Sequence, residues 1–540
     1  MKDLDSVRTK CLLVHTKFSG LSFWNYQEVC YMAGAKYPAA PLGLLTVAAL
    51  FPQHWILRLI DENVEPLLDD HLKWADIICT GGMLPQQKSM LNFIRRAHDF
   101  DRIVVVGGPD PTSQPDVYSE ADFLVLGEGE ITIPMFLNDL QKGVKRGRYF
   151  SEEKANMLKA VVPRYDLINF RNYLMIGVQF TRGCPFNCEF CDIIELYGRI
   201  PRYKSNEQVI KELQSLYDFG YRGHIDIVDD NFIANKKRVK DLLRELKTWT
   251  QNHGFPFYFS TEASINLTED DELLQLMKDV DFRYVFLGIE TPENNTLRLI
   301  KKNHNVNKPI EDAVRKLLSC GIVSNGGYII GFDSESRQIA NNMIDSIQKS
   351  GICMAMISLL YALPNTQLTR RLASEGRLFQ QASRSIGEDD IDQTTSGLNF
   401  KTLIPRTEIL KNFIRVINAV YEPSNYYRRI IFTCLNLRPH YKHTPNFRTR
   451  LLYMRSFLRV CKKAGFNSAT GFYYWKMFLT VIIRNPKGIE AAVNLAAMFI
   501  HFRKQKEYGV STMNHTIGEL EITGEEAYYV RILGNNQRYD

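Results

Sequence analysis

Two series of short apolar segments, each alternating with helix-like segments, constrain the fold of this 540-residue chain more than any other feature. Within residues 1–150 the apolar segments end in polar or glycine-rich residues; they are KCLLVHT, ILRLIDE, ADIICTGG, RIVVVGG and ADFLVLGEGE. Helix-like segments such as QQKSMLNFIRRAHDF lie between them. Strands that alternate with helices predict a parallel sheet, which binds ligands at the carboxyl ends of its strands.

The second series begins near residue 173 and predicts a barrel. Its six strand-like segments are YLMIGVQFTRG, GHIDIVDDNF, PFYFSTEAS, RYVFLGIET, VSNGGYIIGF and CMAMISLLYALP. Helical patterns such as SNEQVIKELQSLYDFG separate them. Six strand–helix units are fewer than the eight of a closed barrel, so we predict an incomplete parallel barrel with its site at the C-terminal rim.

These patterns define the predicted organisation. The fold class is α/β, with a doubly wound parallel-sheet domain at residues 1–150 and a partial (β/α)6 barrel at 175–365. Residues 151–174 are predicted to link them, and residues 366–540 to form a mostly helical region that is basic and aromatic.

The composition indicates a globular protein in a reducing compartment. Hydrophobic residues make up 45% and charged residues 24% of the chain, which allows sizeable cores. Ten cysteines are too few for a disulfide scaffold of this length. The segment MKDLDSVRTK lacks an apolar export signal, and no window has the roughly 18 apolar residues of a membrane span. We therefore expect a cytoplasmic protein.

Three cysteines are gathered in the segment FTRGCPFNCEFCDII, directly after the first strand of the predicted barrel. Cys184, Cys188 and Cys191 have the spacing C-x3-C-x2-C. Three thiolates bind three irons of a four-iron cluster and leave the fourth iron open for a substrate or cofactor. The alternative is a zinc site completed by a distant His or Cys. The spacing and the place at the rim favour the cluster.

On this cysteine motif the sequence resembles the radical S-adenosylmethionine (SAM) family. The resemblance implies that SAM binds the open iron, and that one electron from the cluster cleaves it into methionine and a 5′-deoxyadenosyl radical. It also implies further cofactor-binding residues at successive strand ends: Asp229, Asp230 and Asn231 for the methionine amine, Glu262 for the ribose hydroxyls, and Gly288 and Glu290 beside ribose and adenine. The alternative for each carboxylate is an exposed cap or turn residue.

The first domain resembles the cobalamin-binding domain of B12-dependent radical SAM enzymes, on the segments GGPDPT and LGEGEIT. The resemblance implies that Gly107, Gly108, Gly127 and Gly129 let the backbone approach the cofactor closely. Residues 61–63 read DEN, where many B12 domains carry D-x-H-x-x-G. Cobalamin is therefore expected to bind without a protein histidine on cobalt. The alternative is a degenerate sheet that binds nothing.

The C-terminal region carries an unusual positive charge. Residues 421–506 contain sixteen Lys and Arg and two Glu, a balance of +14, so the rest of the chain sums to −7. Segments such as LLYMRSFLRVCKKAGF mix cations with aromatic and aliphatic residues. We predict peripheral association with the inner face of the membrane. A helical core with solvated basic faces is the alternative; nucleic-acid binding has no recognition motif and is not expected.

The order of the three parts resembles B12-dependent radical SAM enzymes along nearly the whole chain. The C-terminal region, with GLNFKTLIPR at residues 397–406, is similar to the hopanoid C-2 methylase subgroup. The resemblance implies a methyltransferase with a [4Fe-4S] cluster, SAM and cobalamin, which adds a methyl group to an unactivated carbon of a hopanoid-like polycyclic lipid. One SAM would supply the radical and another would methylate cobalamin. A reductant such as flavodoxin or ferredoxin would supply electrons.

Three other functions stay open. Another cobalamin-dependent radical SAM enzyme would cyclise its substrate, or methylate a tetrapyrrole or natural product. A radical SAM methylthiotransferase would need a second cluster, and Cys11, Cys30 and Cys79 are too widely spaced to favour one. A non-enzymatic binding module would not need the cysteine motif.

Overall fold

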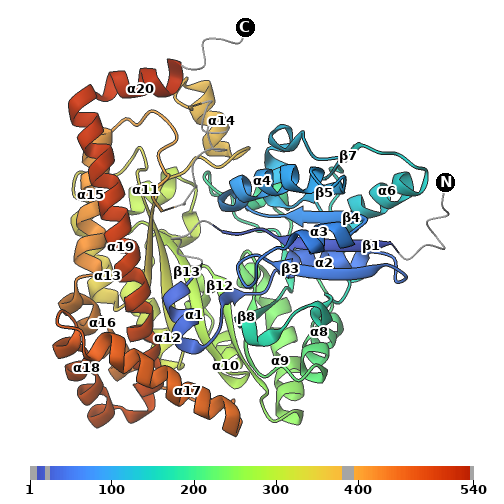
Figure 1. The fold of residues 1–540 in the computed structure, drawn as a ribbon. Coiled ribbons are helices and arrows are strands. Elements are labelled where there is room, and N and C mark those ends of the chain that lie inside the picture. Colours follow the sequence, from blue (N-terminus) through green and yellow to red (C-terminus); the bar gives the residue numbers. More distant parts are fainter. Residues whose placement is uncertain (1–8, 19–24, 380–393, 535–540) are drawn as a thin grey trace.

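The computed structural model describes residues 9–18, 25–379 and 394–534. Figure 1 shows an N-terminal sheet domain in blue, a barrel-like sheet with its helices in green, and C-terminal helices in orange and red on the far side of the barrel. The predicted α/β fold class is confirmed.

The N-terminal sheet has six parallel strands in the order β3-β1-β4-β5-β6-β7. The strands are β1 (Lys10–His15), β3 (Ile56–Asp61), β4 (Ile77–Gly81), β5 (Ile103–Gly107), β6 (Phe123–Val125) and β7 (Gly147–Tyr149). The first five coincide with the predicted strands. The sixth, β7, is a short edge strand whose sequence GRY lacks the apolar run that predicts a strand.

Helices cover both faces of this sheet, as a doubly wound fold requires. Alternate residues of β1 point to opposite faces: Cys11 and Leu13 belong to one apolar core, and Leu12 and Val14 to the other. The first core is covered by α2 (Leu42–Leu50) and α6 (Gly129–Gln141), and the second by α3 (Asp69–Trp74) and α4 (Gln87–His98).

The barrel sheet is open and has seven parallel strands in the order β15-β14-β13-β12-β11-β8-β2. The six predicted strands are β8 (Tyr173–Val178), β11 (Gly223–Ile227), β12 (Phe257–Ala263), β13 (Phe282–Glu290), β14 (Val323–Ile330) and β15 (Ala355–Leu359). The helices that follow the inner strands are α8 (Asn206–Asp218), α9 (Lys236–Asn252), α10 (Asp271–Asp279), α11 (Asn294–Leu299), α12 (Ile310–Ser319) and α13 (Ile339–Ser350).

The C-terminal region is helical, as predicted. Its helices are α14 (Gln367–Ser374), α15 (Arg406–Val420), α16 (Pro423–Asn436), α17 (Phe447–Val460), α18 (Gly471–Arg484), α19 (Ile489–Thr523) and α20 (Glu525–Gly534). Helix α15 packs against α13 and α19, which joins this group to the barrel. Within the described residues, no helix combines the length and the apolar composition of a membrane span.

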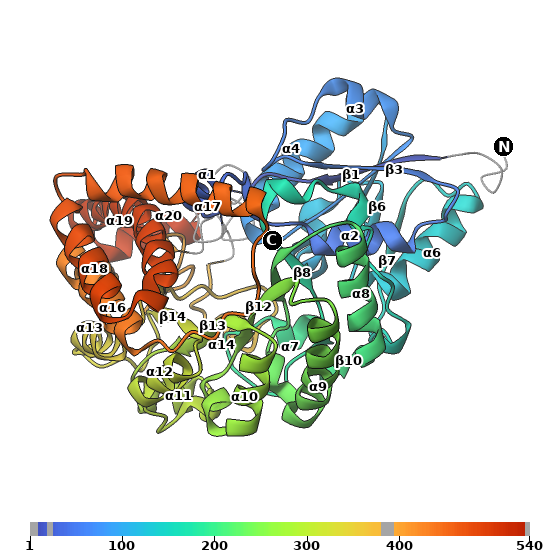
Figure 2. The same ribbon diagram turned by 90° about the horizontal axis from the view of Figure 1, so that it is seen from below.

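Part of the first 150 residues belongs to the barrel rather than to the N-terminal sheet. Strand β2 (Tyr37–Ala39) pairs in parallel with β8, and α1 (Gln27–Ala33) packs against α17 and α19 (Figure 2). Glu28 accepts hydrogen bonds from Lys463 and Lys504. The chain therefore leaves the N-terminal sheet after β1, crosses to the barrel and the C-terminal helices, and returns at α2.

Side chains of the barrel strands alternate between the helical layer and the lumen. On β11, Ile225 and Ile227 are buried towards the helices, whereas His224 and Asp226 border an internal cavity. On β12, Glu262 borders the same cavity. The lumen is therefore partly polar, and its polar groups lie on two adjacent strands.

Candidate active site at the barrel rim

The cysteine loop joins β9 (Thr181–Arg182) to α7 (Ile193–Leu196) at the carboxyl end of β8. Burial raises the pKa of Cys184, Cys188 and Cys191, that of Cys188 to about 11. The charges of neighbouring thiols raise the pKa of Cys188 and Cys191 further, because the three sulfur atoms are close together. A cation bound by the three thiols would favour their ionised forms.

The cysteine loop supplies three thiols and no fourth cysteine or histidine in the same segment. Among the described residues, no three His, Cys, Asp or Glu side chains converge on one metal-ion position. A structural zinc site needs four ligands around one ion, so the loop would need a further ligand from elsewhere in the chain. Cluster thiolates each bind a different iron and need not converge. The trio fits a four-iron cluster with one iron left open.

Two predicted carboxylates hold the backbone that enters the cysteine loop. Asp229 Oδ1 accepts hydrogen bonds from the amides of Phe180 (2.8 Å) and Thr181 (2.9 Å). Asp230 Oδ2 accepts one from the amide of Gly183 (2.9 Å). Burial raises the pKa of Asp229 to about 7 and that of Asp230 to about 6. Both residues therefore shape the loop, whatever else they bind.

Polar atoms next to the loop are left for a ligand. Asp229 Oδ2 and Asn231 Oδ1 are buried and have no hydrogen-bond partner in the described part of the chain. Buried polar atoms rarely stay without a partner in a folded protein. Asn231 also lies beside Cys184. These orphaned acceptors fit the amine of SAM, the role predicted for this segment.

Glu262 lies at the end of β12, on the lumen side. Burial raises its pKa to about 8, and the charges of Asp226, Asp230 and Asp229 add to the effect. Glu262 therefore faces the same polar region as the acidic pair after β11. At neutral pH its carboxyl group is mainly protonated, so it can both donate and accept a hydrogen bond.

Glu290 has a protein partner that the sequence does not reveal. It forms a buried ion pair with Lys302, which lies beside Cys188 and Cys191. Gly288 makes room for this pair, because a Cβ there would lie 2.9 Å from both Glu290 Oε1 and Lys302 Nζ. The charge of Lys302 lowers the pKa of Cys188, and the charge of Glu290 opposes this effect.

A cavity of about 1860 Å³ lies between the N-terminal sheet, the barrel and α17. Its mainly apolar wall includes His15 at the end of β1 and Phe18 after it, Glu262 in the lumen, and Leu452 and Phe457 of α17. Pockets for drug-sized ligands are typically about 300–1000 Å³, so this cavity has room for more than one small molecule.

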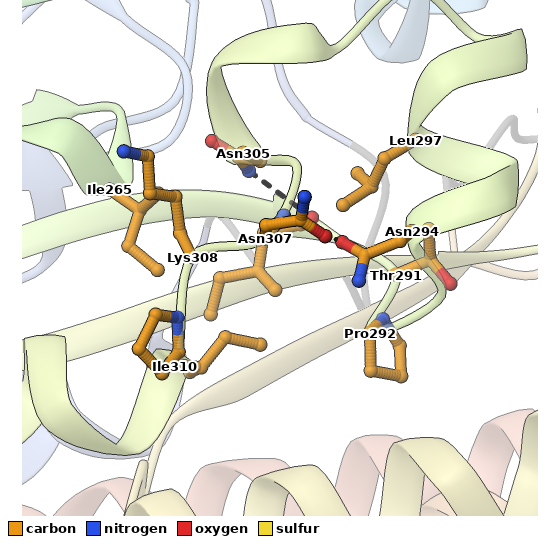
Figure 3. Close-up of a pocket in the computed structure, with 11 residues that line it drawn as sticks. Ile265, Thr291, Pro292, Asn294, Leu297, Asn305, Asn307, Lys308 and Ile310 are labelled. Atoms are coloured by element: carbon orange, nitrogen blue, oxygen red, sulfur yellow. Dashed lines mark hydrogen bonds between the residues drawn. The ribbon is translucent and has the colours of Figure 1, made fainter.

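A smaller pocket of about 380 Å³ lies outside the lumen, between the end of β13 and the helical layer (Figure 3). Ile289 borders it on one side, and Pro309 and Ile310 at the start of α12 border it on another. Asn305 donates a hydrogen bond to the carbonyl of Gly288 at 2.8 Å, which fixes the strand end. The predicted fourth-strand motif therefore separates this pocket from the lumen.

The predicted N-terminal glycines gather at the carboxyl ends of β5 and β6. A Cβ at Gly107 would lie 2.6 Å from the carbonyl oxygen of Val125, and one at Gly108 (φ +98°) 2.9 Å from the amide nitrogen of Gly82. Backbone packing thus requires glycine at both. Neither they nor Gly127 and Gly129 are among the described residues that line the large cavity. Their role in cofactor binding stays a prediction.

The segment around Gly129 instead joins the two domains. Arg182 forms a bidentate pair with Glu130, at 2.7 and 2.9 Å. Arg202 reaches Glu128 at 2.7 Å, and Arg182 also bonds Glu128 at 3.0 Å. The network contains two arginines and two glutamates, so its charges cancel. It connects the start of α6 to β9, the strand that precedes the cysteine loop.

Two parts of the sequence match known protein families. Residues 178–347 match the Radical SAM superfamily, and residues 366–513 match a domain of unknown function (DUF4070). An uncharacterized methyltransferase of Synechocystis sp., sll1242, is 37% identical over 500 residues, which are 92% of this chain and 92% of the relative. The chain belongs to the radical SAM superfamily.

This radical SAM protein is also similar to a hopanoid methylase and to a solved cobalamin-dependent enzyme. Hopanoid C-2 methylase of Rhodopseudomonas palustris is 34% identical over 456 residues, 82% of this chain and 84% of the relative. The solved structure of the cobalamin-dependent S-adenosylmethionine radical enzyme OxsB, with aqua-cobalamin and S-adenosylmethionine bound, matches 94% of this chain and 84% of its own with a TM-score of 0.59 and 16% identity. At that identity the likeness concerns the fold alone.

The predicted family is confirmed, and with it a radical SAM enzyme with an iron–sulfur cluster and SAM. The sequence reasoning missed Lys302, which is the second of two consecutive lysines in the loop after α11. It also did not pair His15 with Asp61. The carboxylate of Asp61 lies 3.2 Å from His15 Nδ1, and the hydroxyl of Tyr173 donates to Asp61 at 3.0 Å. The Lys302–Glu290 and His15–Asp61 pairs each join residues from different elements, so no local sequence pattern predicts them.

Proposed function

We propose that this radical SAM protein is a cobalamin-dependent methyltransferase that acts on an unactivated carbon of a hopanoid-like polycyclic lipid. One observation carries the proposal: a single large cavity reaches from the strand end of the N-terminal sheet to the barrel lumen. A methyl donor held by the sheet and a radical formed at the rim would then meet one substrate. The names and identities of the two curated relatives, both methyltransferases, support the reaction class.

The chain offers residues for each group. Cys184, Cys188 and Cys191 would hold the cluster, and Asp229 and Asn231 would receive the amine of SAM. When bound, these groups supply a 5′-deoxyadenosyl radical for hydrogen abstraction, and cobalamin supplies the methyl group. An electron-transfer protein such as flavodoxin or ferredoxin would serve as reductant.

The cobalamin would bind at the C-terminal edge of the strands of the N-terminal sheet. The ends of β4 and β5 consist of Gly81, Gly82, Gly107 and Gly108, which carry no side chains. Packing of the strand ends on their neighbours requires these glycines, which also keep bulky side chains away from this edge. The OxsB structure, which has the same fold, was solved with aqua-cobalamin bound, and this agrees with a cobalamin site here.

The cavity wall suits an apolar substrate. Phe18, Met32, Met356, Leu452 and Phe457 are among its lining residues. Apolar walls gain about 25 cal/mol for each Å² of apolar surface that a ligand removes from water. They also exclude water from the radical, which would otherwise be open to side reactions. The protein's own contribution is therefore to bind, orient and shield the substrate.

Helix α17 supports access from a lipid surface. Phe447, Leu451, Met454 and Leu458 lie on one helical face and are 81%, 47%, 56% and 59% exposed. The other exposed positions of α17 are rich in arginine. An apolar stripe flanked by cations is typical of helices that lie in the interface of an anionic membrane. Because α17 also borders the cavity, a lipid would have a short route inside.

The test uses protein prepared anaerobically, supplied with cobalamin and reconstituted with iron and sulfide. Iron, sulfide and cobalt are measured, and the protein is then incubated with SAM, a reductant and a bacterial lipid extract. We expect 5′-deoxyadenosine together with a lipid heavier by one methyl group. The control is the variant with Ala in place of Cys184, Cys188 and Cys191, which should yield neither. Deoxyadenosine without a methylated lipid would contradict the proposed substrate.

A further inference from the structure

A chain of three polar side chains crosses the floor of the large cavity. Asp226 on β11 and Ser260 on β12 are register partners on neighbouring parallel strands. The Ser260 hydroxyl donates a hydrogen bond to Asp226 Oδ1, and His224 Nε2 lies 2.7 Å from the Ser260 oxygen. All three residues line the cavity.

The direction of these hydrogen bonds follows from the hydrogens available. Ser260 has one hydroxyl hydrogen, and it points to Asp226. His224 Nε2 must therefore be the protonated nitrogen and donate to Ser260. Burial and the charge of Arg283 lower the pKa of His224 to about 3, so the ring is neutral. Asp226 Oδ2 then has no protein donor among the described residues and faces the cavity.

More polar groups converge on the same place. Tyr26 and Glu262 line the cavity within electrostatic range of Asp226. Asn325 on β14 also lines it, and its Oδ1 is buried without a partner in the described part of the chain. Aromatic and aliphatic residues predominate in the wall, which also carries charged residues such as Arg222, Arg455 and Glu490. The groups around Asp226 form a polar cluster on neighbouring strands of the barrel.

We infer that Asp226, held by Ser260 and His224, binds a hydroxyl group of the substrate and thereby selects which part of the molecule faces the barrel rim. The inference rests on the proposed function and names a feature of its substrate: an alcohol on an otherwise apolar skeleton. Asp226 is partly buried and borders the cavity, so its second carboxyl oxygen is open to a ligand, and a hydroxyl can hydrogen-bond to it.

A hydroxyl fits better than a charged group. An ammonium would need an ionised carboxylate beside it, and burial raises the pKa of both Asp226 and Glu262. A carboxylate or phosphate would find no cation among these polar groups, because the His224 ring is neutral. The hydroxyl also accepts a hydrogen bond as readily as it donates one, which suits the mixed donors and acceptors of Tyr26, Glu262 and Asn325.

The position of this site ties it to specificity. Glu262 follows Ser260 by two residues on the same strand, a distance of roughly 7 Å along the strand. Asp229 follows Asp226 by three residues and lies next to the cysteine loop. A hydroxyl bound at Asp226 therefore holds a substrate carbon near the rim. Without this hydrogen bond, the substrate could bind in several positions along the cavity.

The test measures binding without turnover. Reconstituted protein, without SAM and reductant, is titrated with a pentacyclic triterpene alcohol and with the matching hydrocarbon in the same detergent micelles. We expect the alcohol to bind at least tenfold more tightly to the wild type. The variant Asp226→Leu should lose this preference while binding the hydrocarbon unchanged. Ser456→Ala, on α17 in another part of the wall, is the control and should keep the preference.

If Asp226→Leu does not fold, Ser260→Ala replaces it, with a smaller loss of the same preference expected. Equal binding of alcohol and hydrocarbon by the wild type would overturn the inference, as would equal loss of both ligands in the variant or a preference for an amine analogue. The outcome is separable from the proposed reaction. Lipid methylation without alcohol preference removes only this inference, whereas alcohol preference without methylation removes only the reaction.

Discussion

Arg182 of the barrel and Glu130 of the N-terminal domain form a bidentate ion pair with N–O distances of 2.7 and 2.9 Å. Arg182 precedes Cys184 by two residues, and Glu130 is in the first turn of α6. One side chain therefore couples the position of the N-terminal sheet to the entrance of the cysteine loop. In a reaction that needs two cofactors to meet one substrate, this coupling sets their relative position.

Replacing Arg182 by Ala should destabilise the joint between the two domains. The change leaves the buried Glu130 without a partner and Glu128 with Arg202 alone, and breaking such a pair costs about 3–5 kcal/mol. Urea unfolding would measure the loss. Arg164→Ala breaks an ion pair that is about 40% exposed and should cost less than about 1 kcal/mol. Equal effects of the two variants would contradict the prediction.

Each cysteine of the trio should be essential for iron binding. Cys188→Ala removes one of three ligands, so the protein should retain little iron and sulfide after reconstitution, and 5′-deoxyadenosine formation should fall at least a thousandfold. Cys320→Ala is the matched control, because Cys320 lies at the end of α12, outside the loop. Full iron content and SAM cleavage in Cys188→Ala would refute the cluster assignment.

Lys302 and Glu290 should show strong coupling in a double-mutant cycle. Lys302→Met leaves Glu290 buried and unpaired, which costs about 3–5 kcal/mol. Adding Glu290→Gln removes the unpaired charge and should recover at least half of that loss. Thermal or urea unfolding of the four proteins gives the coupling. Additive effects would mean that the two side chains do not stabilise each other.

Glu262 should make stability fall as the pH rises. Its pKa is about 8 in the folded protein and 4.5 ordinarily, so between these values the folded state keeps a proton that the unfolded chain has lost. Stability then declines by up to about 1.4 kcal/mol per pH unit within that window. Glu262→Gln mimics the protonated form, and its melting temperature should exceed that of the wild type increasingly from pH 5 to pH 8. Parallel profiles would contradict this.

The apolar stripe of α17 should bind vesicles that contain anionic lipid. Serine at Phe447, Leu451, Met454 and Leu458 should weaken binding at least tenfold in a sedimentation assay, because each lost apolar contact costs roughly 1 kcal/mol. Raising the salt concentration should weaken wild-type binding as well.

A matched control replaces four exposed apolar residues outside the C-terminal helices and the large cavity, namely Phe150, Leu158, Ile200 and Leu299. This variant should bind vesicles as the wild type does. If the two quadruple variants bind vesicles equally well, α17 is not the surface that contacts the membrane.

The sequence by itself determined the elements and the central chemistry. Continuous apolar runs such as RIVVVGG predict buried parallel strands, because such strands are covered on both faces. The cysteine spacing identifies the cluster loop, because its three ligands lie within eight consecutive residues. Both patterns lie within a short stretch of sequence, so they can be recognised without knowledge of the fold.

Only the tertiary structure decided which distant residues share a site. Strand β2 joins the barrel although it precedes α2 of the N-terminal domain, Lys302 reaches the cysteine loop, and Asp226 meets Ser260 across two strands. Each of these relationships depends on strand order and on which face a side chain occupies. A change of one residue in register would turn Asp226 into the helical layer, and no property of the residue itself would reveal the difference.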